Sequence, residues 1–425
     1  MRILVIGSGG REHAIAWKLK QSPKVSKVFV APGNAGTGTD DGLDNVNITD
    51  AKELIEFAKT SDIAFTVVGP EAPLSEGIVD SFEAAGLKIF GPRRAPAQLE
   101  SSKEFAKNFM DQYGIPTAAY KTFTDATAAH AYIDQRGVPI VVKADGLAAG
   151  KGVVVAMTLE EAHNAVDMML VENGMGLAGA KVVIEDFLSG EEASFIVMID
   201  GDNILPLATS QDHKRLLEND EGPNTGGMGA YSPAPVVTPE IHAKAIKQVI
   251  QPVVDGMNDL GTPFTGFLYA GLMISPDGSL KVLEFNCRLG DPETQPIMMR
   301  LQSSIVELCE AALRGELDKT TAKWDPRPSI GVVMAAGGYP GDYNKGDVIS
   351  LPTSLPADSK IFHAGTALNG DDVVTAGGRV LCVTALGETV TDAQARAYEL
   401  LKQVSWKDAY FRTDIAYRAI AREKA

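Results

Sequence analysis

The first hundred residues alternate short apolar segments with helix-like segments, and this alternation constrains the fold more than any other feature of the chain. The apolar segments, at 2–7, 27–33, 63–70 and 87–92, are rich in residues that favour strands. The segments between them, including 11–21, 51–60 and 75–86, have helical character. Because strands that alternate with helices form a parallel sheet covered on both faces, we predict an α/β protein that begins with a doubly wound domain.

The turn after the first predicted strand, GSGGREH, argues against a nicotinamide cofactor. The third glycine of the dinucleotide-binding fingerprint would fall at Glu12, and the end of the second strand, VFVAPGN, supplies no acid for a ribose hydroxyl. The backbone of Gly9 and Gly10, together with Arg11, would instead suit a single phosphate group at a helix N-terminus. A tight turn whose glycines serve only packing is the alternative.

A second glycine-rich segment, GLAAGKG at 146–152, is similar to a P-loop but differs from it on counting. Three residues separate Gly146 from Gly150 where a P-loop has four, and Gly152 follows Lys151 where a P-loop has Ser or Thr. The segment VVVAM that follows favours a strand, so we predict a β-hairpin carrying Lys143 and Lys151. Such a hairpin can cover a polyphosphate as a mobile lid. An ordinary glycine-rich hairpin with solvated lysines is the alternative.

A helix is expected to begin at Ser101, which forms a capping-box pattern with Glu104. Lys103 and Lys107 would then lie on one face of that helix, because residues four apart are neighbours on a helix surface. The pattern fits two lysines that bind a ligand and fits equally well two lysines that are solvated.

The segment KVLEFNCRLGDPETQP carries the most informative pattern for chemistry. Side chains alternate along a strand, so Glu284, Asn286 and Arg288 should share one face. The opposite face would then be apolar, with Phe285, Cys287 and Leu289, so a nucleophilic role for the cysteine is not expected. Carboxylate and amide oxygens are ligands that suit Mg²⁺, and a guanidinium suits anionic oxygens. A solvated polar face of an edge strand is the alternative.

A long polar loop, TSQDHKRLLENDEGPNTGGMGAYSPAP, is the third candidate region. Loops of more than twenty residues in a compact domain are usually functional, and this one carries Asp212, His213, Lys214 and Arg215. The histidine could act as a base, but a lone loop histidine is more often solvated. We find no Ser-His-Asp or Cys-His arrangement, so the predicted sites act through electrostatics and not through a nucleophile.

The overall charge and the cysteine count restrict the partners and the compartment. A net charge of −16 over 425 residues argues against a protein that binds nucleic acid or an anionic membrane. Three widely spaced cysteines suggest neither a disulfide framework nor a zinc site, and the apolar runs are too short for a signal peptide or a membrane span. We therefore expect a cytoplasmic protein, either a monomer or a small homo-oligomer.

Three domains are expected along the chain. The doubly wound domain should occupy 1–103, and a central domain of two subdomains should occupy 104–325, with 122–190 as the smaller, lid-like part. The proline-marked segment WDPRPS then separates a small α+β domain at 326–425.

Together these patterns resemble the ATP-grasp ligases, in which a nucleotide lies between two α/β subdomains. Within that superfamily the chain resembles the phosphoribosylamine-glycine ligase family, also called glycinamide ribonucleotide synthetases. The resemblance is carried by ordered segments from the N-terminal to the last domain: VIGSGGREHA, FVAPGNAGT, VGPEAPL, KADGLAAGKGV, GEEASF, SQDHKR, GPNTGGMGAYSPAP, TGFLYAGLM, EFNCRLGDPETQ, MAAGGYPGDY and GGRVLCVTA.

The resemblance implies a reaction that joins glycine to 5-phosphoribosylamine, an early step of purine biosynthesis. ATP is the co-substrate, Mg²⁺ or Mn²⁺ the metal, and glycyl phosphate the intermediate. The rival enzymatic reading is an ATP-grasp ligase or carboxylase with a different acceptor. A non-enzymatic nucleotide-binding regulator is the rival from another class of protein.

The resemblance also implies the residues of the nucleotide site. Three lysines should neutralise the ATP phosphates beneath the loop from Gly146 through Gly150 to Gly152: Lys103, Lys143 and Lys151. The adenine would meet the backbone around Glu185, Phe187 and Leu188, and the nucleotide ribose would meet Glu192.

The remaining implied residues belong to the metal and to the reacting groups. Glu284 and Asn286 are the expected metal ligands. Arg288 is the expected group that stabilises the acyl phosphate, and Lys143 and Asp212 are the other expected catalytic residues. The phosphate of phosphoribosylamine is expected at Gly9, Gly10 and Arg11, with GPEAPL nearby. Some ATP-grasp enzymes carry a second acidic metal ligand on the neighbouring strand, but YAGLM offers none here.

Overall fold

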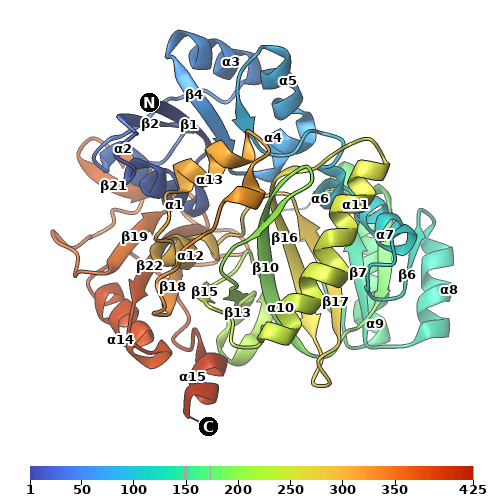
Figure 1. Ribbon diagram of the computed structural model, residues 1–425. Coiled ribbons are helices and arrows are strands. Elements are labelled where there is room, and N and C mark those ends of the chain that lie inside the picture. Colours follow the sequence, from blue (N-terminus) through green and yellow to red (C-terminus); the bar gives the residue numbers. More distant parts are fainter. Residues whose placement is uncertain (148–151, 173, 425) are drawn as a thin grey trace.

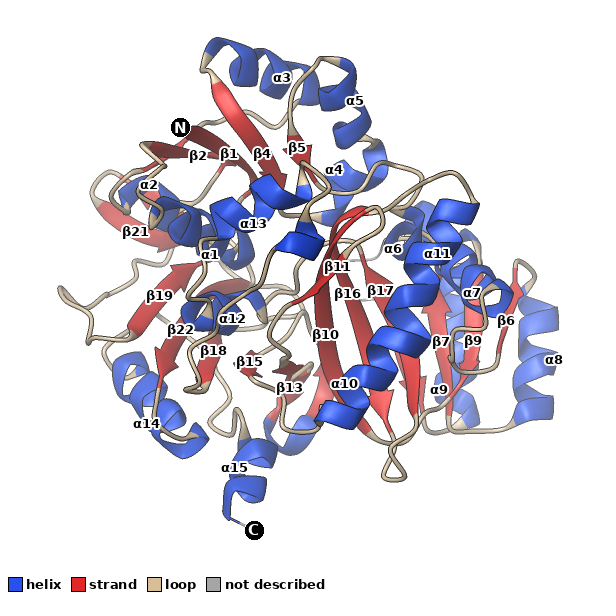
Figure 2. Ribbon diagram, viewed as in Figure 1, coloured by secondary structure: helices blue, strands red, loops and turns tan. Residues whose placement is uncertain are grey.

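The computed structural model describes residues 1–147, 152–172 and 174–424, and the chain begins with the predicted parallel sheet (Figures 1 and 2). Its order is β3-β2-β1-β4-β5, and all neighbouring pairs are parallel. The strands are β1 Arg2–Gly7, β2 Lys27–Pro32, β3 Leu43–Asn45, β4 Ile63–Val68 and β5 Ile89–Phe90. The helices between them are α1 Gly10–Lys20, α2 Ala35–Thr39, α3 Ala51–Thr60, α4 Glu71–Glu76 and α5 Ile78–Ala84. The predicted doubly wound α/β class is confirmed.

The central part of the chain is built on a second, antiparallel sheet of order β11-β10-β16-β17. Its strands are β10 Glu191–Asp200, β11 Ile204–Pro206, β16 Thr265–Ile274 and β17 Leu280–Asn286. One face packs against helices α6 Gln98–Ser101, α7 Lys103–Gln112, α10 Pro239–Ala245 and α11 Gln251–Asp259. A π-type turn at Ile246–Ile250 joins the last two. 

The start of α7 differs by one residue from the prediction. Ser102, and not Ser101, is the N-cap, and its hydroxyl accepts a hydrogen bond from the N–H of Phe105 at 3.1 Å. Glu104 does not return to the cap, because its carboxylate pairs with Lys181 of the neighbouring subdomain. The sequence pattern located the helix but not the partner of its first acidic residue.

A smaller subdomain carries the predicted glycine-rich hairpin on a sheet of order β6-β9-β7-β8. Its strands are β6 Tyr120–Phe123, β7 Ile140–Ala144, β8 Val153–Ala156 and β9 Val182–Asp186. Two helices cover it, α8 Ala126–Arg136 and α9 Leu159–Val166, the second followed by a π-type turn at Asp167–Val171 and a 3-10 turn at Gly176–Ala180. The antiparallel pairing of β7 with β8, in which Lys143 lies opposite Val153, confirms the hairpin.

The last sheet has the order β12-β15-β18-β22-β19 and lies at lower left in Figure 1. Its strands are β12 Gln211–Asp212, β15 Gly229–Ser232, β18 Ser329–Ala335, β19 Ser359–His363 and β22 Arg379–Leu386. Two hairpins adjoin it, β13 Arg215–Leu217 with β14 Glu221–Asn224, and β20 Thr366–Asn369 with β21 Asp372–Thr375. The helices that follow β17 in the chain are α12 Thr294–Arg300, α13 Ile305–Ala312, α14 Val390–Leu401 and α15 Tyr417–Lys424. Short 3-10 turns occur at Glu218–Asp220 and Leu317–Lys319.

This sheet reaches back across the expected boundary at 325. Strands β12 and β15 come from the long polar loop, and β15 pairs directly with β18. A single apolar core then joins all three large sheets, because α12 and α13 lie among residues of β1, β10 and β22. The polar loop is therefore held between the central and last domains. In the described ranges, no helix combines the length and apolar character needed to cross a membrane.

Candidate active site

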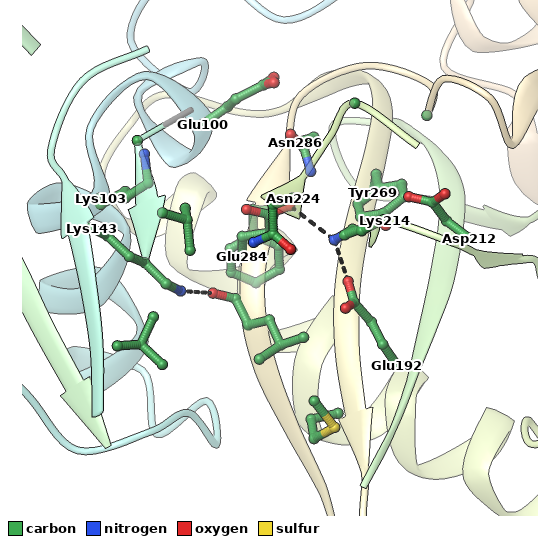
Figure 3. Close-up of a pocket in the computed structure, with 18 of the residues that line it drawn as sticks. Glu100, Lys103, Lys143, Glu192, Asp212, Lys214, Asn224, Tyr269, Glu284 and Asn286 are labelled. Atoms are coloured by element: carbon green, nitrogen blue, oxygen red, sulfur yellow. Dashed lines mark hydrogen bonds and ion pairs between the residues drawn. The ribbon is translucent and has the colours of Figure 1, made fainter. Parts of the chain in front are cut away.

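One cavity of about 710 Å³ lies where the N-terminal, central, lid and last domains meet. Most of the side chains expected to have functional roles line it (Figure 3). Those that do are Arg11, Lys103, Lys143, Gly152, Glu185, Phe187, Leu188, Glu192, Asp212, Glu284, Asn286 and Arg288. Gly9, Gly10 and Gly146 are not among its described lining residues, and Gly150 and Lys151 lie outside the described residues.

The lid side of the cavity is positively charged and comes from β7 and α7. Lys143 projects from β7 to within 3.0 Å of Glu185 and donates a hydrogen bond to the backbone carbonyl of Leu283 at 3.1 Å. Lys107 approaches the other oxygen of the same carboxylate, also at 3.0 Å. One carboxylate therefore lies between two ammonium groups. Burial lowers the pKa of Lys107 to about 8.

Lys103 stands at the first position of α7, close to the root of the hairpin. Its ammonium lies 3.3 Å from the carbonyl oxygen of Gly146. Burial lowers its pKa, although the nearby Glu284 acts in the opposite direction. Lysines of α7 and of the β7–β8 hairpin therefore lie in the same part of the cavity. This arrangement fits the interpretation in which Lys103 and Lys107 bind a ligand.

The opposite wall is the end of β17, where a bulge changes the strand register. Gly271 pairs with Glu284 but Leu272 pairs with Val282, so Leu283 is the extra residue whose carbonyl accepts from Lys143. Bulges commonly re-aim side chains beside active sites. Beyond the bulge the predicted alternation holds, since Phe285 and Cys287 belong to the apolar core and Glu284 and Asn286 do not, although Phe285 also borders the cavity.

Glu284 is a carboxylate held in its ionised form. Burial by itself raises its pKa, but Lys214, Lys143, Lys103 and Arg288 outweigh burial and lower the pKa to about 2. Lys214 lies 3.7 Å from Glu284 and forms a closer ion pair with Glu192 (Figure 3). Such a charged oxygen beside an amide oxygen fits a hard divalent cation.

Arg288 lies just past the end of β17 and pairs with two acids from other parts of the chain. Its guanidinium lies 2.9 Å from Glu100 and 3.3 Å from Glu71, and it donates to the amide oxygen of Asn286 at 3.0 Å. Burial by itself lowers the pKa of Arg288, but Glu100 and Glu71 outweigh it and raise the pKa. Its Nε is buried and is the atom that lies 3.3 Å from Glu71.

The N-terminal loop differs from the expected phosphate site. The N–H of Gly9 donates to the carboxylate of Glu12 at 2.6 Å, and Arg11 forms an ion pair with the same carboxylate at 2.6 Å. An added Cβ at Gly7 or Gly69 would also collide with this side chain. Glu12 stands where the fingerprint has its third glycine, and its carboxylate therefore occupies the place at the start of α1 that was expected to hold a phosphate. Of Gly9, Gly10 and Arg11, only Arg11 lines the cavity.

His213 is buried, so the expectation of a solvated loop histidine is wrong. Its side chain is 4% exposed, with Nδ1 3.4 Å from Asp220 and Nε2 accepting from the N–H of Ala416 at 2.9 Å. Burial lowers its pKa, and both ring nitrogens contact protein groups. This histidine joins the polar loop to the C-terminal segment.

Several lining residues had been given no role from the sequence: Glu71, Glu100, Tyr269, Asp291, Glu293, Arg379 and Arg418. Glu71 lies in GPEAPL, and Asp291 and Glu293 in GDPET, so their segments had been singled out without roles. Arg379 comes from the last domain, where no local pattern marks it. Its guanidinium donates to the backbone carbonyls of Gly226 and Asp291 and thereby joins that domain to the cavity wall.

Three family models match consecutive parts of the chain. The N domain of phosphoribosylglycinamide synthetase matches residues 1–100, its ATP-grasp (A) domain 101–294 and its C domain 329–418.

Relatives agree over their full length. The phosphoribosylamine–glycine ligases of Vibrio cholerae and Escherichia coli are 63% and 61% identical to this chain, with 100% of both sequences covered. The crystal structure of the Thermotoga maritima phosphoribosylamine–glycine ligase is 35% identical, with a TM-score of 0.85, and covers 98% of this chain and 100% of its own. The biotin carboxylase domain of the Hydrogenobacter thermophilus 2-oxoglutarate carboxylase shares the fold, at 16% identity and a TM-score of 0.74. The chain therefore belongs to the phosphoribosylglycinamide synthetase family.

Proposed function

We propose that this protein joins glycine to 5-phosphoribosylamine and cleaves ATP to ADP and phosphate. One observation carries the proposal: a single cavity presents lysines from the lid side and a carboxylate–amide pair from β17 on the facing side. Charge neutralisation from two sides is what phosphoryl transfer requires, since the protein contributes mainly positioning and electrostatics. The same arrangement needs no nucleophile, and Cys287 is buried in the core.

Nucleotide binding is assigned to the lid side. Lys103 and Lys143 would neutralise the ATP phosphates, with the 146–152 loop closing above them. The strand end and linker that contain Glu185, Phe187 and Leu188 line the cavity and would meet the adenine, with Glu192 at the ribose. Glu185 has a further role, because its carboxylate holds the ammonium of Lys143 in place.

The metal is assigned to Glu284 and Asn286. Among the described residues, no group of three or more His, Cys, Asp and Glu side chains is arranged to hold an ion. Two protein oxygens suit a cation that takes its other ligands from phosphate and water. Mg²⁺ or Mn²⁺ bound there would neutralise charge on the transferred phosphoryl group.

The reaction proceeds in two steps. The glycine carboxylate attacks the γ-phosphorus of ATP, which forms glycyl phosphate and releases ADP. The amine of phosphoribosylamine then attacks the acyl carbon, loses a proton, and expels phosphate as the amide forms. Arg288, which lines the cavity beside Asn286, would stabilise the acyl phosphate. Arg11 and Glu71 line the cavity towards the N-terminal domain and would meet the phosphoribosyl group.

ADP release by the purified full chain tests the proposal. Release should require glycine, 5-phosphoribosylamine, ATP and a divalent cation together. Stimulation by bicarbonate or another amino acid in place of glycine would identify a different ATP-grasp ligase or carboxylase. The absence of turnover with every acid tested would leave a nucleotide-binding regulator.

We also infer that the protein works in the cytoplasm. Its three cysteines are free and buried, which agrees with a reducing compartment. Fluorescence microscopy of a tagged chain checks this inference.

A further inference from the structure

Two histidines meet on the helical face of the lid subdomain. His130 comes from α8 and His163 from α9, and these helices pack against each other towards the right of Figure 1. The two Nδ1 atoms lie 2.6 Å apart, and the ring centroids lie 4.7 Å apart. The side chains are 27% and 29% exposed, so a small ion reaches both rings from solvent.

Each ring also has an aspartate, supplied by the other helix. His130 and Asp134 are four residues apart on α8, and His163 and Asp167 are four residues apart where α9 ends. The hydrogen bonds cross between the helices. Nε2 of His130 lies 2.9 Å from Asp167, and Nε2 of His163 lies 3.0 Å from Asp134. The four groups therefore form one chain, with an aspartate at each end and the two imidazoles in the middle.

The outer hydrogen bonds determine which ring nitrogens carry hydrogen. An ionised carboxylate only accepts, so we assign a hydrogen to Nε2 of each ring, and a neutral ring then has a bare Nδ1. The Nδ1 lone pairs of His130 and His163 would face each other at 2.6 Å and repel. A cation between the rings, either one shared proton or a metal ion, removes this repulsion.

The chemistry of the four groups favours a transition metal over magnesium. Imidazole nitrogen suits Zn²⁺, Cu²⁺ and Ni²⁺, whereas Mg²⁺ prefers oxygen. A histidine that binds a metal usually donates its other N–H to a carboxylate, as both rings are placed to do here. Two nitrogens at about 2.0–2.1 Å from Zn²⁺ lie about 3.3 Å apart at the tetrahedral angle, so a separation of the rings by less than about 1 Å would admit the ion.

This pair of histidines is separate from the catalytic metal site. On β7, Lys143 lines the cavity, whereas Val142 packs into the core beneath α8 and α9. Neighbouring residues of a strand point to opposite faces, so the histidines and Glu284 lie on opposite sides of the lid sheet. In the part of the chain that the structure describes, no three metal-binding side chains converge on one point. The two imidazoles would therefore be the protein ligands, with water completing the shell.

We propose that His130 and His163 form a binding site for a transition-metal ion of the zinc type, and that Asp134 and Asp167 orient the two rings. The bound ion would join α8 to α9 and thereby tie together the two helices that cover the lid sheet. The inference goes beyond the ligase reaction and does not depend on it.

Competition with a chromophoric zinc indicator tests the site in the full chain, with Mg²⁺ in large excess to saturate the oxygen ligands of the cavity. Wild type should bind one more Zn²⁺ per chain than His130→Gln or His163→Gln. Asp134→Asn should keep the site but weaken it about 10- to 100-fold, because the carboxylate no longer orients the ring. His242→Gln removes a partly exposed histidine of α10 that packs on Phe195, and this control should bind Zn²⁺ like wild type.

Anomalous diffraction from wild-type crystals soaked in Zn²⁺ covers the case in which a glutamine variant does not fold. A peak should lie about 2.0–2.1 Å from Nδ1 of both His130 and His163. Equal zinc binding by wild type and both folded glutamine variants, or zinc peaks only at other places, would overturn the proposal. Failure of wild type to bind Zn²⁺ would also overturn it and would leave a shared proton as the cation between the rings.

Discussion

Two buried polar clusters of this protein differ in how completely their groups are paired. The first lines the cavity, where the buried Oδ1 of Asp212 lacks a hydrogen-bond partner among the described residues. The second joins α1 and α2 of the N-terminal domain to β19 of the last domain. There, His13 lies 3.0 Å from Asp40 and accepts from the N–H of His363 at 2.9 Å, and Lys360 forms an ion pair with Asp40.

The difference indicates what each cluster does. Buried polar groups are normally hydrogen-bonded, and an unpaired one costs free energy unless a ligand completes it. In the junction cluster the charges and imidazoles complete one another, so it stabilises the relative position of two domains. In the cavity cluster the completing groups must come from substrates. Changes in the cavity should therefore reduce activity more than stability, and changes in the junction should do the reverse.

Removing the metal carboxylate should give the largest effect. Glu284→Ala takes away the ionised ligand, and turnover should fall by at least about a thousandfold because charge on the phosphoryl group is no longer neutralised. The thermal unfolding midpoint should stay near that of wild type, since Lys214 keeps Glu192 as its partner. Steady-state ADP release and calorimetry measure both. Wild-type activity in this variant would disprove the metal assignment.

Removing a lid lysine should give the next largest effect. Lys143→Met deletes a cation facing the phosphates, and kcat/KM for ATP should fall about 100-fold. Glu185 keeps Lys107 as a partner at 3.0 Å, so the fold should persist. Lys121→Met, on β6 and outside the cavity lining, is a control that should retain kcat/KM. If Lys143→Met reduced stability more than activity, Lys143 would behave like a residue of the junction cluster and not like a residue of the cavity.

The junction cluster should respond in the opposite way. Asp40→Asn leaves Lys360 without its carboxylate and weakens the bond to His13, so the free energy of unfolding should fall by about 1–3 kcal/mol. The values of kcat and KM should stay within about twofold of wild type at 25 °C. Thermal unfolding and ADP release are the measurements. A loss of activity exceeding tenfold in the folded variant would contradict the division between the two clusters.

The smallest expected effect is a change in how the stability of the protein depends on pH. Burial and the neighbouring His13 lower the pKa of His363 to about 3 from an ordinary value of about 6.5. The neutral ring therefore contributes stability that is present above about pH 6.5 and is lost as the pH falls towards about 3. His363→Gln lacks this titration, so the stability difference between wild type and variant should narrow by about 1 kcal/mol between pH 7 and 5.5. A difference that is constant or widens over that range would show that the ring is not held neutral.

Local patterns predicted the strand and the two alternating faces of β17. The alternation of Glu284 and Asn286 with Phe285 and Cys287 follows from the period of a strand with one buried face, and the structure has it. The hairpin of β7 and β8 likewise follows from valines on both sides of a glycine-rich turn. The bulge at Leu283 was not predicted, because it depends on pairing with β16.

Local patterns failed where a distant residue supplies the partner. Glu12 occupies the loop that had been assigned to a phosphate, and the sequence showed only that it was not glycine. His213 is buried by residues about 200 positions away, so its loop environment misled the prediction. Asp212 was named as catalytic, but only the structure shows that Glu293 lines the same cavity.

The sequence by itself determined the strands, helices and turns and the kinds of chemical group they carry, because these depend on the nearest few residues. The tertiary structure alone decided which charges meet. Arg288 pairs with Glu71 and Glu100, residues far away in the chain, and Asp212 shares its pocket with Glu293. Electrostatic energies depend on distances between groups and on burial, and packing of whole domains sets both.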